Sequence, residues 1–283
     1  MEFIRYDGGG VPEWGVVSES TVYPLGGHPA GAPTISDIGN PGYRAVVRDA
    51  LDTGAIEGIP ATDVSPLAPV PRPGKIVCVG LNYAGHAAEQ DREAPDSPKL
   101  FSKAPSAVTN PGAPIVHPAD VAEVDYEVEL AVVVGQTAYD VDAADVPGYV
   151  AGYTVLNDVT ARDAVATDGQ NFRGKSYPTF APMGPRLVTG EAFDPDDARI
   201  SLRLNGIEKQ CSTTATMVTD VAALFEYVSS VVTLRPGDVI ATGTPAGTGV
   251  HRDPPELLQP GDVVAAEIDG VGVLENPVVA EST

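Results

Sequence analysis

Short apolar segments, separated by turns rich in glycine and proline, recur along most of the chain. Segments of about four to eight residues with this character are typical of strands. We expect strands at Trp14–Val17, Val22–Leu25, Ile76–Val79, Glu127–Val134, Gly152–Leu156, Ile200–Leu204, Val239–Thr242, Val263–Ile268 and Val271–Leu274. The last two flank Asp269-Gly270, a dipeptide favoured in hairpin turns, so we expect them to pair.

Helical periodicity is confined to a few segments. The clearest helix is predicted over Val218–Val231, where apolar residues recur on one face. Another is expected around Tyr43–Leu51, and a short one over Val159–Val165 with Asp158 in the N-cap position. Many strands and few helices favour a mainly β (α+β) fold, a twisted or rolled β-sandwich, over a doubly wound α/β sheet.

A proline-rich segment divides the chain into two unequal parts. Pro66–Gly74 contains four prolines in nine residues, so it should be extended and semi-rigid. We place a domain boundary there, between a small N-terminal domain (residues 1–70) and a main domain (residues 71–283).

The charge of the chain excludes several function classes. Its 283 residues include 39 acidic and 17 basic ones, a formal net charge of −22. No basic stripe is present to neutralise phosphates, so nucleic acid is not an expected partner, and anionic membranes repel such a surface. No apolar segment approaches the roughly 20 residues that span a bilayer, and Met1–Asp7 does not resemble a signal peptide. We therefore expect a cytoplasmic protein without a membrane partner.

Three carboxylates form the most informative constellation. Glu127 and Glu129 alternate with apolar residues, so in a strand they share a face with Cα atoms about 7 Å apart. No lysine or arginine is nearby in sequence, and Mg²⁺ or Mn²⁺ would satisfy both acids. Asp158 ends the next apolar strand and could be a third ligand. The alternatives are a solvated strand face for the glutamates, and for Asp158 a helix cap or a surface pair with Arg162.

A second constellation follows the first strand of the main domain. His86 and Glu89 are spaced i, i+3 on a short helix, so the carboxylate can orient the imidazole to take a proton from water. The charged, proline-bearing segment Gln90–Pro98 has the character of a mobile lid. The alternative is an exposed helical ion pair.

Two loops offer groups that suit an anionic ligand. Arg173–Tyr177 is a cationic loop that contains Lys175. Thr242–Gly249 is a glycine-rich turn after a strand, and it lacks the Gly-Lys-Ser/Thr ending of a phosphate loop. We therefore interpret it as a turn that presents hydroxyl and amide groups.

Taken in order, several segments resemble the fumarylacetoacetate hydrolase family, over about Lys75–Val279. They are Val79–Tyr83 with His86 and Glu89, Asp125–Leu130, Asn157–Asp163, Gly174–Ser176, Pro236–Asp238 and Thr242–Pro245. The resemblance implies a mixed β-sandwich roll with a small N-terminal domain and a homodimer. It also implies one Mg²⁺ or Mn²⁺ site per subunit, with Ca²⁺ as a substitute in crystals.

The resemblance also assigns roles to residues of this sequence. Glu127, Glu129 and Asp158 match the metal ligands, and His86, Glu89 and Lys175 match the catalytic groups. Tyr83, Arg162 and Thr244 are expected to contact the substrate, a small anionic oxo acid. Two positions depart from the family pattern, since Val165 stands where many members have Gln and Leu81 where some have Arg.

These residues lead to one main hypothesis and two alternatives. The main hypothesis is hydrolytic cleavage of a C–C bond in a 1,3-dioxo acid of the acylpyruvate or fumarylacetoacetate type, with a metal-stabilised enolate and water activated by His86 and Glu89. The first alternative is an isomerase, decarboxylase or dehydratase that uses the same enolate on a 2-oxo or 2-hydroxy-diene diacid or a 2-keto-3-deoxy sugar acid. The second is a non-catalytic relative that binds metal or oxo acids.

The acidic surface generates a prediction about salt. Molar salt shortens the Debye length to about 3 Å and screens self-repulsion, so a halophilic protein should melt at a higher temperature in molar KCl than in dilute buffer. Thermal melts at several salt concentrations measure this. Maximal stability in dilute buffer would instead indicate an ordinary acidic enzyme.

Overall fold

The computed structural model describes residues 1–27 and 31–282. Its strands are β1 Glu2–Asp7, β2 Pro12–Ser18, β3 Thr21–Pro24, β4 Ile59–Pro60, β5 Ser65–Leu67, β6 Ile76–Gly80, β7 Lys99–Lys103, β8 Val108–Thr109, β9 Ile115–His117, β10 Val124–Asp125, β11 Val128–Val134, β12 Val150–Asn157, β13 Thr160–Ala161, β14 Ala181–Val188, β15 Arg199–Leu204, β16 Ile207–Thr213, β17 Val239–Ala241, β18 Val263–Ile268 and β19 Gly272–Ala280. Its α-helices are α1 Ile35–Gly39, α2 Pro41–Asp52, α3 Ala84–Ala88, α4 Arg162–Asp168 and α5 Val221–Val231. The fold is mainly β, as predicted.

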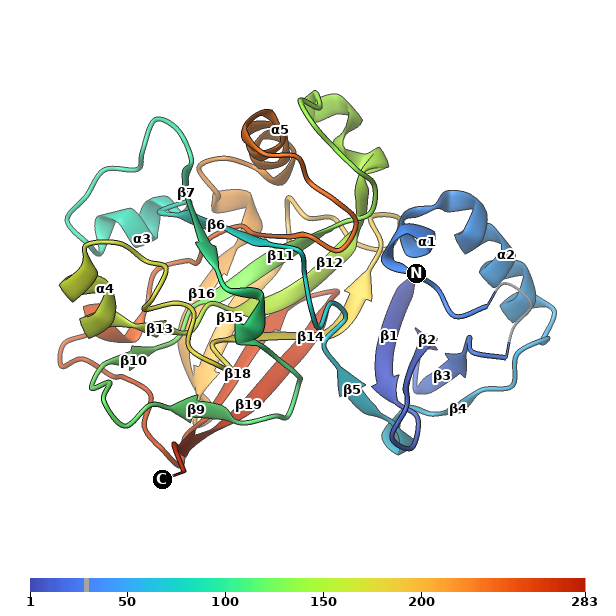
Figure 1. Ribbon diagram of the computed structural model, residues 1–283, viewed down its shortest axis with the longest axis horizontal. Coiled ribbons are helices and arrows are strands. Elements are labelled where there is room, and N and C mark those ends of the chain that lie inside the picture. The colour runs from blue at the N-terminus through green and yellow to red at the C-terminus, as the bar shows by residue number, and fades with distance from the viewer. Residues whose placement is uncertain (28–30, 283) are drawn as a thin grey trace.

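One large mixed sheet runs through the molecule in the order β4-β3-β2-β1-β14-β12-β11-β17-β6-β7. In Figure 1, β1–β4 and helices α1 and α2 lie to one side of a larger body. They join it where β1 pairs with β14, through Glu2 opposite Val188 and Phe3 opposite Leu187. The chain between β5 and β6 passes through the predicted proline-rich boundary, and the division into two domains stays a prediction.

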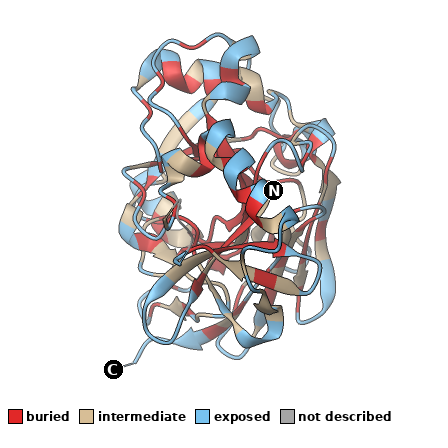
Figure 2. Cartoon of the chain, turned by 90° about the vertical axis from the view of Figure 1, so that its right-hand side faces the viewer, coloured by how far each residue is buried: buried red, intermediate tan, exposed pale blue. Residues whose placement is uncertain are grey.

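A second sheet, in the order β16-β15-β18-β19-β9, packs on the β11, β12 and β14 region of the large sheet. Figure 2 shows that buried residues fill the interior and that exposed ones lie on outer loops and helix faces. Every residue of β11 and β12 is buried. These two antiparallel strands therefore form the centre of the fold.

The predicted strands of the main domain are confirmed with small shifts at their ends. Glu127 lies just before β11, and β12 is longer than predicted at both ends. The hairpin at Asp269-Gly270 forms between β18 and β19, where Gly270 has a φ of +81°. Strands β7, β14 and β16 were not predicted, because prolines in β14 and polar residues in β16 obscure their alternation.

Two helix predictions need correction. The long helix begins at Val221 with Asp220 as its N-cap, three residues later than expected. The short helix begins at Arg162, and its N-cap position is held by Ala161. Asp158 therefore caps no helix, because β13 stands between it and α4. Within the described ranges, no helix is long and apolar enough to cross a membrane.

Gln210 joins the two sheets. It lies on β16 and is completely buried. Its Oε1 accepts the N–H of Val128 at 3.0 Å, and its Nε2 donates to Thr244 Oγ1 and to the Pro245 carbonyl, both at 2.8 Å. The start of β11 and the turn after β17 are thus tied to the second sheet.

We predict that Gln210→Leu lowers the free energy of unfolding by about 2–4 kcal/mol, because it leaves a buried N–H and a buried carbonyl unpaired. Chemical denaturation measures the change. The matched control is Gln136→Leu, which removes one exposed hydrogen bond to Gly148 and should cost less than about 1 kcal/mol. Equal losses in the two variants would contradict this role for Gln210.

Candidate active site

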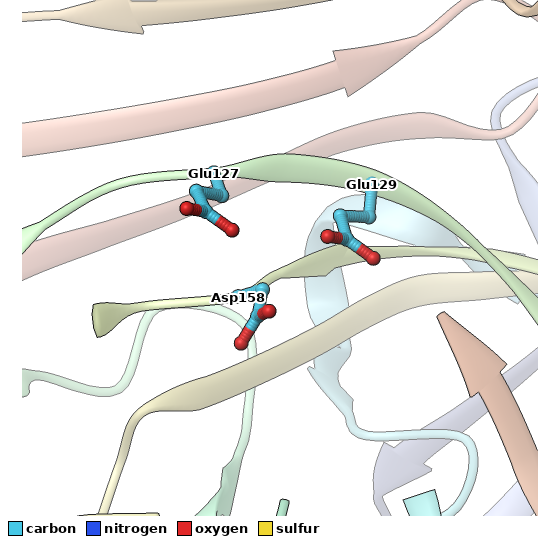
Figure 3. Close-up of side chains that lie close together, drawn as sticks. All are labelled: Glu127, Glu129 and Asp158. Atoms are coloured by element: carbon cyan, nitrogen blue, oxygen red, sulfur yellow. The ribbon is translucent and has the colours of Figure 1, made fainter. Parts of the chain in front are cut away.

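The three predicted acids converge where β11 begins and β12 ends. Val128 pairs with Asn157, and the N–H of Asp158 donates to the carbonyl of Glu127 at 2.8 Å. Figure 3 shows the side chains of Glu127, Glu129 and Asp158 turned toward one another. Each can offer an oxygen within 4.8 Å of the others, although the three residues are only 4%, 1% and 0% exposed. A solvated strand face is excluded.

Three cations balance these acids. Lys175 Nζ lies 2.7 Å from Glu127 Oε2 and contacts Asp158 Oδ2, while Lys103 Nζ lies 2.5 Å from Asp158 Oδ1. Arg162 Nη2 lies 2.6 Å from Glu127 Oε1. No lysine or arginine lies near the glutamates in sequence, and folding brings all three cations in from other segments.

Charge contacts shift the titration of this cluster. Burial alone would raise the pKa of Glu127, but Lys175 and Arg162 hold it well below its ordinary value. Burial likewise opposes the charge of Lys175, and the carboxylates of Asp158 and Glu127 raise its pKa overall. Burial and the nearby Asp158 carboxylate raise the pKa of Glu129 well above its ordinary value.

Glu129 is the acid that lacks a cation. Its Oε2 accepts the Gly243 N–H at 2.9 Å, yet in the described part of the chain no lysine or arginine lies within ion-pair distance of it. A buried carboxylate in this position is costly unless a cation joins it. Three buried carboxylates from two neighbouring strands are a donor set that fits a hard divalent ion such as Mg²⁺ or Mn²⁺.

Arg162 does not pair with Asp158 on the surface, as one alternative held. Its guanidinium bridges Glu127 and Asp125, with 2.8 Å between Nε and Asp125 Oδ2. Asp125 is fully buried and also accepts the N–H groups of Gly249 at 2.7 Å and Val250 at 3.1 Å. Arg162 therefore connects the carboxylate cluster to the end of the glycine-rich turn.

His86 and Glu89 form a dyad on and just after α3. Nδ1 of His86 lies 2.6 Å from Glu89 Oε1, and the histidine is only 6% exposed, so the pair is not a surface ion pair. Glu89 also accepts the Gly247 N–H at 2.7 Å and the Thr248 hydroxyl at 3.1 Å. Burial raises the pKa of Glu89, but the bonds from His86 and Gly247 bring it below its ordinary value.

The contacts of His86 match one tautomer of the histidine. The Glu89 carboxylate can only accept, so Nδ1 of His86 carries the ring proton, and Nε2 is then able to accept from Gln90 Nε2, which lies 2.9 Å away. The ring proton then lies on Nδ1, facing Glu89. This is the arrangement that a general base requires.

One cavity of about 320 Å³ is lined by His86 of the dyad and by Glu127 and Glu129 of the carboxylate cluster, while Glu89 and Asp158 lie behind them. Its polar lining consists of His86, Gln90, Arg92, Lys99, Glu127, Glu129, Arg162, Asn171, Lys175 and Thr244. Leu81 and Val165, the two departures from the family pattern, also line it. Both residues contribute apolar side chains to the cavity wall. Gln90 and Arg92 belong to the predicted lid segment.

Two predicted substrate contacts are placed differently. Tyr83 is 1% exposed, its hydroxyl is buried, and it does not line the cavity. Thr244 lines the cavity, but its hydroxyl donates to the Val128 carbonyl at 2.9 Å and accepts from Gln210. The Thr244 hydroxyl therefore holds the turn against β11.

Lys103, Gln90, Arg92 and Lys99 were not predicted as site residues. The chain has only five lysines, and three of them, Lys99, Lys103 and Lys175, lie at this site. The small number of lysines in the sequence could therefore have pointed to these positions as site residues. The position of Lys103 behind Asp158 could not be inferred, because it depends on how β7 and β12 meet in space.

Comparisons with known proteins agree with this geometry. Residues 75–279 match the family described as fumarylacetoacetate (FAA) hydrolase C-terminal. The mitochondrial oxaloacetate tautomerase Fahd2a of Rattus norvegicus is 47% identical over 223 residues, which cover 78% of this chain and 71% of the relative.

Two of the similar solved structures match 100% of this chain over 100% of their own length. The 2-hydroxyhepta-2,4-diene-1,7-dioate isomerase from Mycobacterium marinum has a TM-score of 0.80 at 35% identity. The maleylpyruvate hydrolase from Sphingobium sp. SYK-6, solved in complex with manganese(II) and pyruvate, has a TM-score of 0.83 at 31% identity. These three relatives carry out different reactions on small oxo or hydroxy acids. Because the family model matches residues 75–279, well over half of the sequence, this chain belongs to the fumarylacetoacetate hydrolase family.

Proposed function

We propose that the protein is a divalent-metal-dependent hydrolase that cleaves a C–C bond in a small 1,3-dioxo acid of the acylpyruvate or fumarylacetoacetate type. The observation that carries the proposal is the His86–Glu89 dyad, whose histidine lines the same cavity as Glu127 and Glu129 of the carboxylate cluster. Both hydrolysis and isomerisation use the cluster to stabilise an enolate, and attack by water in addition needs an oriented base, which the dyad provides.

Glu127, Glu129 and Asp158 would hold the ion, as the manganese in the maleylpyruvate hydrolase structure supports. When bound, Mg²⁺ or Mn²⁺ supplies Lewis-acid polarisation of the 2-oxo carboxylate end of the substrate. Arg162 adds fixed positive charge on that side. Arg92 and Lys99 line the same cavity, so a chain with a net charge of −22 still offers an anionic substrate a cationic lining.

The dyad performs the proton transfers. Gln90 releases His86 Nε2, and a water molecule takes its place. His86 accepts one proton from that water while Glu89 stabilises the imidazolium. The hydroxide forms a C–O bond at the distal carbonyl, and the C–C bond breaks. Its electron pair moves to the carbon that joins the 2-oxo acid, and the imidazolium returns the proton there. Lys175 stabilises the developing oxyanion.

A second candidate is isomerisation or tautomerisation of an oxo acid without attack by water. The names of the rat tautomerase and the Mycobacterium marinum isomerase support it. The same dyad would then shuttle a proton between two carbons or from carbon to oxygen. Decarboxylation and dehydration use the same enolate, and the cavity has no feature that favours them. We also propose that the protein is cytoplasmic, that it forms a homodimer and that it is adapted to high salt.

We predict that His86→Ala and Glu89→Gln lower kcat/KM for an acylpyruvate by about 10²–10⁴-fold, because water loses its oriented base. The Kd for Mn²⁺ should stay unchanged, since neither residue belongs to the carboxylate cluster. The matched control is His251→Ala, whose ring centroid lies 6.4 Å from that of His86 outside the cavity lining, and it should retain activity. Full activity of His86→Ala would refute the proposed base.

Isotope labelling separates hydrolysis from isomerisation. In H₂¹⁸O, hydrolysis should place one ¹⁸O in the carboxylate of the released acid, because the hydroxide attacks the distal carbonyl. Mass spectrometry of the products measures this, with the same acid incubated without enzyme as the control for exchange. A product of unchanged mass, formed at full turnover, would favour the isomerase.

A further inference from the structure

Lys103 is a buried lysine that the mechanism above does not use. It is the last residue of β7 and only 1% exposed. Its ammonium group lies 2.5 Å from Asp158 Oδ1 and 3.0 Å from the Val159 carbonyl. It is not among the residues that line the cavity, so it is not placed to contact a substrate.

The two oxygens of Asp158 have different partners. Oδ1 accepts from Lys103, whereas Oδ2 accepts from Lys175. Lys175 lines the cavity and also binds Glu127, so Oδ2 is the oxygen on the side where the carboxylates converge. Lys103 holds Asp158 from the opposite side.

Strand β7 organises more than one contact of the cluster. Lys103 also fixes the chain after Asp158, through the Val159 carbonyl. The N–H of Ala104 donates to Ser176 Oγ at 2.9 Å, which ties the loop that bears Lys175 to the end of β7. The Lys175 ammonium lies 5.1 Å from the centre of the Phe101 ring, on the same strand. Burying an ammonium group is costly, so this arrangement calls for a role beyond packing.

We propose that Lys103 is a positioning residue for the metal centre. It occupies Oδ1 of Asp158 and so presents Oδ2 alone as the ligand oxygen. Its ammonium group also offsets part of the repulsion among Glu127, Glu129 and Asp158. The proposal rests on the proposed function only in that these carboxylates bind a divalent ion. Partners of this kind in metal sites are worth about 10–100-fold in metal affinity.

The test measures binding of Mn²⁺ alone, by isothermal titration calorimetry, to the full-length protein and to Lys103→Met. Methionine keeps the length of the side chain and removes the charge and the donors. We expect the Kd for Mn²⁺ to rise about 10–100-fold. The matched control is Lys75→Met, which breaks the Lys75–Asp238 pair outside the cavity lining and should leave the Kd unchanged.

A folded Lys103→Met variant with the wild-type Kd would overturn the proposal, as would an equal rise in Kd in Lys75→Met. If Lys103→Met does not fold, Lys103→Gln removes the charge and keeps a donor for the Val159 carbonyl, and a wild-type Kd for Mn²⁺ in that variant would overturn the role of the charge. Wild-type protein that binds no Mn²⁺ would refute the metal centre itself. Wild-type protein that binds Mn²⁺ but cleaves no oxo acid would refute the reaction and leave the role of Lys103 intact.

Discussion

Mutual repulsion among three buried carboxylates is the constraint around which this structure is arranged. Glu127, Glu129 and Asp158 are brought together by the pairing of β11 with β12, two strands that are buried along their whole length. Charged groups in such surroundings persist only when opposite charges and hydrogen bonds compensate them. Lysines from β7 and from the loop before β14 supply part of that compensation, and Arg162 supplies another part.

The glycine-rich turn after β17 connects the two halves of the site. Its N–H groups at Gly243, Gly247 and Gly249 donate to Glu129, Glu89 and Asp125 in turn. Side chains at these positions would collide with the backbone, since a Cβ on Gly247 would lie 2.2 Å from the carbonyl oxygen of Lys209. The turn therefore holds three carboxylates in place through its N–H groups. The sequence alone predicted that it presents hydroxyl and amide groups to an anionic ligand.

The sequence could predict the features that depend on local periodicity. Strands β11 and β12, the shared face of Glu127 and Glu129, and the spacing of His86 and Glu89 all follow from residues close together in the chain. Partners far apart in sequence could not be predicted, such as Lys103 with Asp158. The alternative role of Asp158 as a helix cap is wrong, because β13 stands between this residue and α4.

Three acids of the site, Glu129, Glu89 and Asp125, are held by backbone N–H groups, so their orientation does not depend on which side chains line the cavity. An N–H group is the same whatever side chain follows it, it does not titrate near neutral pH, and salt screens a short buried contact only weakly. Substitutions at Leu81 and Val165, which form the apolar wall of the cavity, can therefore change the shape of the cavity while the acids keep their orientation. Proteins that share this turn can therefore differ in substrate specificity while they keep the same arrangement of catalytic groups.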